Sequence, residues 1–184
     1  GTGSTTITAT GTVNAGFGVA DQTANVDGIY ALNSATATDL SISAKDVTGL
    51  DDGIYAVNEG AGSLSISVTG DVTSTSTDKS DTSYAYGIYA SGYGTDLTAL
   101  VNGDVTSNDR GILLSNNGSG STSFTSNGKI STILGPAEDN PYGGSSAWHN
   151  VGIYALNHTN STAKDITINT NQVESYGAAI WADN

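Results

Sequence analysis

Short stretches of alternating apolar and polar residues run along the chain, and LSISV at 64–68 is a regular example. Successive side chains of a β-strand point to opposite faces, so this alternation predicts a strand with one buried face. A second stretch, GIYALN at 28–33, recurs with small changes as far as AIWADN at 179–184. Its six copies begin at residues 28, 53, 87, 111, 152 and 179. No stretch with the period of a helix competes with these patterns, so the chain is expected to be all-β.

A second landmark lies between successive copies, a polar residue followed by a short apolar strand. It begins at residues 45, 70, 103, 128 and 171. The step from copy to landmark is 17, 17, 16, 17 and 19 residues, whereas the step to the next copy is 8, 17, 8, 24 and 8. A nearly constant part beside a variable part predicts a β-solenoid of about six coils, with three strands in each coil. The long variable parts are insertions near residues 15–27, 74–86 and 132–151, and all three should emerge at one vertex.

Stacking the copies in register gives each position of the motif a place in the fold. The isoleucine and alanine positions should fill the core, and the asparagine position should form a ladder of hydrogen bonds where the strand ends. The isoleucine column consists of Ile29, Ile54, Ile88, Ile112, Ile153 and Ile180. Leu64, Ile66, Leu97 and Phe124 are expected to be buried with it. The asparagine column reads Asn33, Asn58, Gly92, Asn116, Asn157 and Asn184.

The aromatic position of the motif should face outward. Its column reads Tyr30, Tyr55, Tyr89, Leu113, Tyr154 and Trp181. Two interpretations remain open, mutual packing of stacked rings and an exposed contact surface for a partner. The longest insertion adds aromatic residues and both prolines, which suit an interface anchor on a rigid scaffold. The candidate partner-binding residues are therefore Tyr30, Tyr55, Tyr89, Tyr142, Trp148, His149, Tyr154 and Trp181.

The charge of the chain excludes some partners. Five basic residues against 18 acidic ones give a formal net charge of -13, which leaves no electrostatic footprint for nucleic acid and repels anionic membranes. A basic protein or a cation is a more natural partner. The absence of cysteine excludes disulfides, and no apolar run is long enough to span a bilayer. We expect residues 1–184 to form a single domain belonging to a longer protein.

The candidate catalytic and metal-binding patterns are weak. Asp51-Asp52 could divide acid and base roles in a polysaccharide-acting enzyme, but acidic residues are also common in short turns. The stretch GYGTDL at 92–97 is half of a calcium-binding repeat and stands alone, so that only weak calcium binding is conceivable. Outward serines and threonines at positions such as Ser65 and Thr98 could order water in an ice-binding protein, yet Leu100 interrupts them. We therefore expect no catalytic residue, cofactor or metal.

Repeats of the form DGIYA-x-N followed by LSISVTGDVT resemble the passenger domains of Gram-negative autotransporters, which use type V secretion. This resemblance covers essentially the whole chain. It implies a right-handed parallel β-helix that is secreted or held at the cell surface by a C-terminal translocator barrel. It also implies a virulence-related adhesin or receptor ligand, whose partner would be a host protein, a glycan or another copy of itself. The alternative is a structural stalk that holds another region away from the cell.

Overall fold

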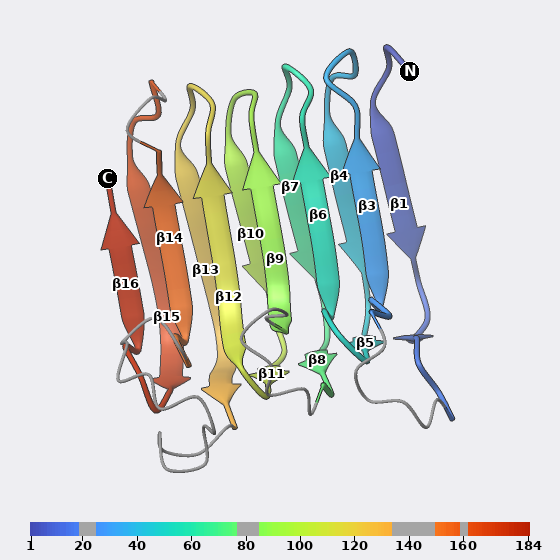
Figure 1. Ribbon diagram of the computed structural model, residues 1–184, viewed down its shortest axis with the longest axis vertical. Helices are drawn as coiled ribbons and strands as arrows, with labels where there is room; N and C mark the ends of the chain where they lie inside the picture. The colour runs from blue at the N-terminus through green and yellow to red at the C-terminus, as the bar shows by residue number, and fades with distance from the viewer. Residues whose placement is uncertain (19–24, 77–84, 134–149, 159–161) are drawn as a thin grey trace.

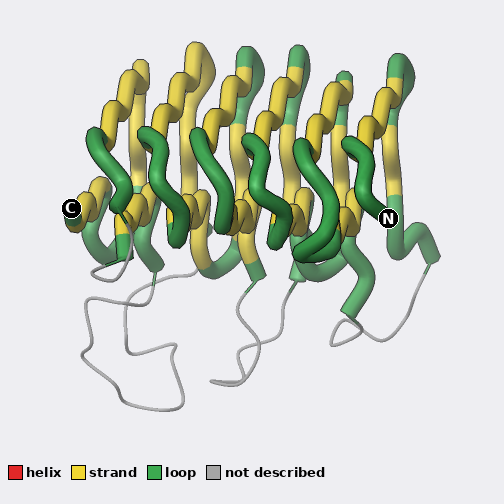
Figure 2. The backbone as a smooth tube through the Cα atoms, turned by 90° about the horizontal axis from the view of Figure 1, so that it is seen from above, coloured by secondary structure: helices red, strands yellow, loops and turns green. Residues whose placement is uncertain are grey.

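The regular structure of this chain consists of parallel β-strands. The computed structural model describes residues 1–18, 25–76, 85–133, 150–158 and 162–184, and these contain strands but no helix. Accordingly, no helix in these ranges could cross a membrane. The strands form two sheets stacked face to face, with every strand running parallel to its neighbours (Figures 1 and 2). This arrangement is consistent with the predicted β-solenoid.

The six copies of the GIYALN motif form one sheet of six strands. Their order across the sheet is β16-β14-β12-β9-β6-β3, so each copy pairs with the copy before and after it in sequence. The strands are β3 (Ile29–Asn33), β6 (Ile54–Asn58), β9 (Tyr86–Gly92), β12 (Arg110–Asn116), β14 (Ile153–Asn157) and β16 (Ile180–Asp183). This six-stranded sheet carries the candidate aromatic column.

The intervening segments form the second sheet, which has ten strands. Its long members are β1 (Thr5–Ala9), β4 (Leu40–Ala44), β7 (Leu64–Val68), β10 (Leu97–Val101), β13 (Thr122–Thr132) and β15 (Ile166–Glu174). Its short members are β2 (Val13–Asn14), β5 (Val47–Gly49), β8 (Val72–Ser74) and β11 (Val105–Ser107). A repeat has the expected three strands where its long and its short strand in this sheet are separated by a turn, the third strand being in the six-stranded sheet. In β13 and β15 they are continuous, and the pairing of these two strands shifts register between Ser126 and Lys129.

The core lies between the two sheets, and the predicted columns line it. Ile54 and Ile88 pair in register and are fully buried, as is Phe124 on the facing sheet. The other residues expected in the core are confirmed as buried: Ile112, Leu64, Ile66 and Leu97. Ile180 is an exception, because its side chain is 45% exposed. It lies in β16, which is paired on one side only, so no further strand covers it.

The asparagine ladder is present and joins adjacent strands of the six-stranded sheet. The Asn33 side-chain amide donates to Oδ1 of Asn58 at 3.0 Å, and the Asn157 amide donates to Oδ1 of Asn184 at 2.6 Å. Asn58 is fully buried and also donates to three backbone carbonyls of the neighbouring turns. Gly92 interrupts the ladder, since it has no side chain at the position between Asn58 and Asn116.

The long insertions begin and end at one edge of the fold. Their described ends lie where the chain passes from the ten-stranded sheet to the next strand of the six-stranded sheet, after the short strands β2 and β8 and after the end of the continuous strand β13. Hydrogen bonds to the adjacent repeat hold these ends: Thr75 N–H donates to the Gly49 carbonyl, and Ile133 N–H donates to the Ser107 carbonyl. The insertions therefore start from anchored backbone at equivalent places.

Candidate functional site

The aromatic column lies on the outward side of the six-stranded sheet, as the sequence predicts. We call its six residues the tyrosine face: Tyr30, Tyr55, Tyr89, Leu113, Tyr154 and Trp181. Parallel in-register pairing places each residue of the column beside the equivalent residue of the next strand. Tyr30 is 62% exposed, and the other members are partly exposed.

The first three rings of the tyrosine face stack on one another. The centroids of Tyr30 and Tyr55 are 5.1 Å apart, and those of Tyr55 and Tyr89 are 4.7 Å apart. The ring planes differ by only 4° and 6°, so Tyr55 has a neighbouring ring over each of its faces. Of the two interpretations that the sequence left open, mutual packing of the rings therefore applies at least to Tyr30, Tyr55 and Tyr89. With both faces of Tyr55 covered, the edge of its ring is the part left for contact with solvent or a partner.

The second part of the tyrosine face has a different geometry. Leu113 replaces tyrosine in β12 and separates Tyr89 from Tyr154. Beyond it, Tyr154 and Trp181 meet edge to face, with centroids 5.9 Å apart and planes at 61°. Both arrangements are favourable for aromatic pairs, but only the first gives a regular stack.

Tyr86 and Arg110 border the tyrosine face where the strands begin. The Tyr86 ring meets that of Tyr89 edge to face at 5.4 Å. The Arg110 Nη1 donates a 2.9 Å hydrogen bond to the Tyr86 hydroxyl, and its Cζ lies 5.6 Å from the centre of the Tyr86 ring. Burial raises the pKa of Tyr86 to about 12, although the charge and hydrogen bond of Arg110 oppose this shift. Tyr86 therefore stays a neutral phenol at every physiological pH.

Three carboxyl groups lie together beside this border, and we call Asp27, Asp51 and Asp52 the acidic corner. An oxygen of each lies within 4.8 Å of the others. Asp52 is buried and accepts a 2.7 Å hydrogen bond from the Tyr86 N–H, while Asp27 accepts one of 3.1 Å from the Asp52 N–H. These bonds link one repeat to the next, so Asp52 has a structural task in addition to any chemical one.

Burial controls the protonation of the acidic corner. It raises the pKa of the Asp52 carboxyl to about 8, and the nearby charges of Asp51 and Asp27 add to that shift against the Tyr86 hydrogen bond. Burial also raises the pKa of Asp27. By contrast, the hydrogen bond from the Asp71 N–H lowers the pKa of the solvent-exposed Asp46. At neutral pH the Asp52 carboxyl therefore holds a proton that a free aspartate would have released.

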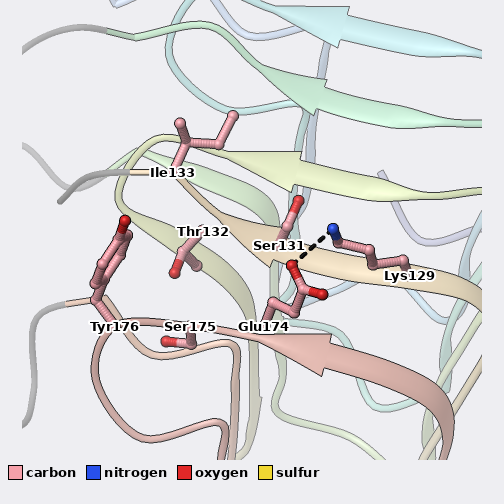
Figure 3. A pocket seen from close by; sticks show the side chains of 7 residues that line it. All are labelled: Lys129, Ser131, Thr132, Ile133, Glu174, Ser175 and Tyr176. Atoms are coloured by element: carbon pink, nitrogen blue, oxygen red, sulfur yellow. Dashed lines mark ion pairs between the residues drawn. The ribbon is translucent and has the colours of Figure 1, made fainter.

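A hollow of about 360 Å³ lies on the other sheet, near the ends of β13 and β15 (Figure 3). It is lined by Lys129, Ser131, Thr132, Ile133, Glu174, Ser175 and Tyr176. The Lys129 ammonium and the Glu174 carboxylate form an ion pair across it at 2.7 Å. Since these two charges neutralise each other, the hollow offers no free charge of either sign to a ligand.

The predicted partner-binding residues separate into two groups. Tyr30, Tyr55 and Tyr89 are brought together as a stack, and Tyr154 and Trp181 as a second pair. The remaining three, Tyr142, Trp148 and His149, lie outside the described residues. Whether any of the eight binds a partner stays a prediction.

The sequence analysis singled out Asp51-Asp52 but missed Asp27. Asp27 lies 25 residues earlier in the chain, and only the stacking of repeats brings it to Asp52. A signal was available, because both residues precede the glycine of the motif, in DGIYALN and in DGIYAVN. Equivalent positions in adjacent repeats become neighbours in space, so a carboxylate at one position predicts a pair.

Comparison with known proteins leaves the identity of the chain open. No protein family model matches it, no curated protein is similar to it, and no solved structure resembles its fold at the significance required. A function for this chain is therefore inferred from its own sequence and geometry.

Proposed function

We propose that this chain is a right-handed parallel β-helix of about six coils and serves as the passenger domain of a Gram-negative autotransporter. In this proposal it acts outside the bacterium, at the cell surface or after secretion, as a non-catalytic adhesin or host-receptor ligand. Support comes from the in-register parallel strands and from the repeat that the passenger domains resemble.

The tyrosine face is the observation that carries the proposal. Aromatic rings held on the outer surface of a sheet are not part of its core, whereas aromatic residues are enriched at interfaces. The rings of Tyr55, Tyr89 and Tyr154 are held by strands whose opposite sides are buried, so this part of the surface is preorganised and loses little entropy on binding. An exposed apolar surface on a rigid scaffold is suited to contact with another molecule.

The positions of the insertions add to this argument. The anchored ends of the insertions lie at equivalent places, next to where the strands of the six-stranded sheet begin. Tyr86 and Arg110 lie beside the insertion that precedes β9. Loops on a rigid scaffold are where recognition usually resides. The proposed binding surface therefore comprises the tyrosine face together with the edge from which the insertions emerge.

One member of the acidic pair that could support catalysis has a structural role. Asp52 is buried, and its carboxyl accepts the Tyr86 N–H where the chain returns from an insertion. A general acid must reach its substrate, so a buried carboxyl engaged with backbone is poorly placed for polysaccharide cleavage. This geometry favours binding over hydrolysis.

A structural stalk is the second candidate, and the ring stacking favours it. Tyr55 contacts neighbouring rings on both faces, which stabilises the column without any partner. A stalk predicts that the isolated chain binds no host component.

The two candidates can be separated with beads that carry the purified chain. Beads are incubated with cultured mammalian cells and, in parallel, the labelled chain is applied to a glycan array. An adhesin predicts saturable binding above that of albumin-coated beads, or a defined set of glycans. Binding no stronger than albumin in both assays would contradict the adhesin and support the stalk.

A further inference from the structure

We propose that the tyrosine face and the acidic corner together bind a basic, extended segment of a partner protein, with lysine or arginine side chains as the groups recognised. This proposal rests on the proposed adhesin function and specifies the chemistry of its partner. It follows from which parts of the aromatic rings remain accessible and from the charges beside them.

The stacking of the rings limits what they can bind. A sugar ring or a cation seeks the flat face of an aromatic ring, where the π-electrons lie. Both faces of Tyr55 are covered, by Tyr30 at 5.1 Å and by Tyr89 at 4.7 Å. A ligand that needed these faces would first have to separate the stack.

What the stack leaves uncovered is a strip of apolar ring edges, since Tyr55 is stacked on both of its faces. Long aliphatic stems can lie along such a strip while their charged ends reach beyond it, as lysine and arginine side chains do on protein surfaces. Leu32, which is 55% exposed in the same strand as Tyr30, extends the apolar strip along that strand. The surface thus fits the stems of basic residues better than it fits a sugar.

The charges beside the strip complete the argument. Burial is the main reason why the pKa of Tyr55 is raised, and the charge of Asp27 contributes, so the acidic corner acts electrostatically on the stack although Asp52 itself holds a proton at neutral pH. Among the basic residues that the structure describes, only Arg110 lies in the six-stranded sheet, and its guanidinium bonds Tyr86. With a net charge of -13 for the whole chain, the face attracts cationic groups.

The test uses the complete chain and a fluorescent oligolysine peptide, with binding followed by fluorescence anisotropy at low and at physiological salt. We expect saturable binding that weakens as salt rises, because the charges are partly exposed and therefore screened. The Tyr55→Ser variant should weaken binding roughly tenfold, which corresponds to about 1.4 kcal/mol. Tyr30→Ser, which removes a ring that is already 62% exposed, should weaken it while keeping the fold.

A matched pair of double variants separates site-specific charge from overall charge. Asp27→Asn/Asp51→Asn removes two charges from the acidic corner and should weaken peptide binding roughly tenfold. Asp46→Asn/Asp71→Asn removes two charges from a corner of the ten-stranded sheet and should leave binding unchanged. The asparagine oxygens can still accept the N–H groups of Asp71 and Asp104 that these aspartates bind.

Two results overturn the proposal. One is no saturable binding of the peptide, and the other is equal weakening by both double variants, which would reduce the effect to net charge. The proposed adhesin function and the proposed basic partner can be tested independently of each other. If cells or neutral glycans bind the chain, and Tyr55→Ser abolishes that binding whereas the Asp27→Asn/Asp51→Asn variant does not, the adhesin stands and the basic partner is wrong.

Discussion

Replacing Asp52 by asparagine should make the protein more stable at neutral pH. The carboxyl is 4% exposed and accepts the Tyr86 N–H at 2.7 Å, and an asparagine oxygen can accept the same bond. The substitution therefore removes a buried titratable group and keeps its structural contact. Few substitutions of a buried, hydrogen-bonded residue are expected to be stabilising, so the direction of the effect is informative.

The magnitude follows from the difference in pKa between the folded and the unfolded chain. Burial raises the pKa of Asp52 from 3.8 to about 8, so the folded state binds a proton that the unfolded state releases. The contribution of this proton to the free energy of unfolding is fully present below pH 3.8 and is lost progressively as the pH rises toward about 8. At pH 7, which lies about three units above the unfolded pKa, the loss amounts to about 4 kcal/mol, since each unit corresponds to about 1.4 kcal/mol. The Asp52→Asn variant lacks this loss.

The assay is urea unfolding of both proteins, followed by circular dichroism between about pH 3 and pH 9. We expect the free energy of unfolding of Asp52→Asn to exceed that of the unsubstituted chain by roughly 2–4 kcal/mol at pH 7. The difference should shrink toward zero at the acidic end. A variant that is less stable at pH 7, or a difference independent of pH, would refute the view that Asp52 is buried as a neutral acid.

Three further substitutions test the packing of the ladders, all by urea unfolding at fixed pH. Ile88→Ala should cost roughly 2–5 kcal/mol, because Ile88 is fully buried between strands, and a cost below about 0.5 kcal/mol would contradict its place in the core. Asn58→Ala should cost roughly 2–4 kcal/mol, because three carbonyls and the Asn33 amide lose their partner; a neutral result would mean that the ladder contributes nothing. Gly92→Asn should raise stability by about 0.5–1 kcal/mol, since an added Cβ meets its nearest atoms at ordinary distances of 3.7–3.8 Å, and a clear loss would show that the gap in the ladder is required.

The fold could be predicted from the sequence where a pattern is local and repeated. Alternation in β7 fixed which side chains point inward, and the recurrence of the motif fixed which residues become neighbours on adjacent strands. The burial of Ile54 and Phe124 and the hydrogen bond from Asn33 to Asn58 follow directly from these two facts. Repetition makes long-range contacts predictable, because equivalent positions stack.

The remaining features depend on geometry that a pattern does not contain. The sequence placed Tyr30 and Tyr55 in one column but could not say that their planes would be only 4° apart. The pKa of Asp52 depends on burial and on Asp27, which comes from another repeat. Likewise, the continuity of β13 depends on how the chain crosses Ser126 to Lys129, where its pairing with β15 shifts register.

The central claim is that the tyrosine face binds a partner, and the binding of coated beads to cultured cells tests it most directly. Beads carrying the unsubstituted chain are compared with beads carrying Tyr30→Ser/Tyr55→Ser, at equal surface density and after circular dichroism has shown both to be folded. A Ser41→Ala variant, changed on the ten-stranded sheet, serves as the control. The account predicts that the tyrosine variant loses most of its binding, roughly tenfold or more, whereas the control keeps it. Equal binding by all three proteins would contradict the claim and leave the stacked rings as packing alone.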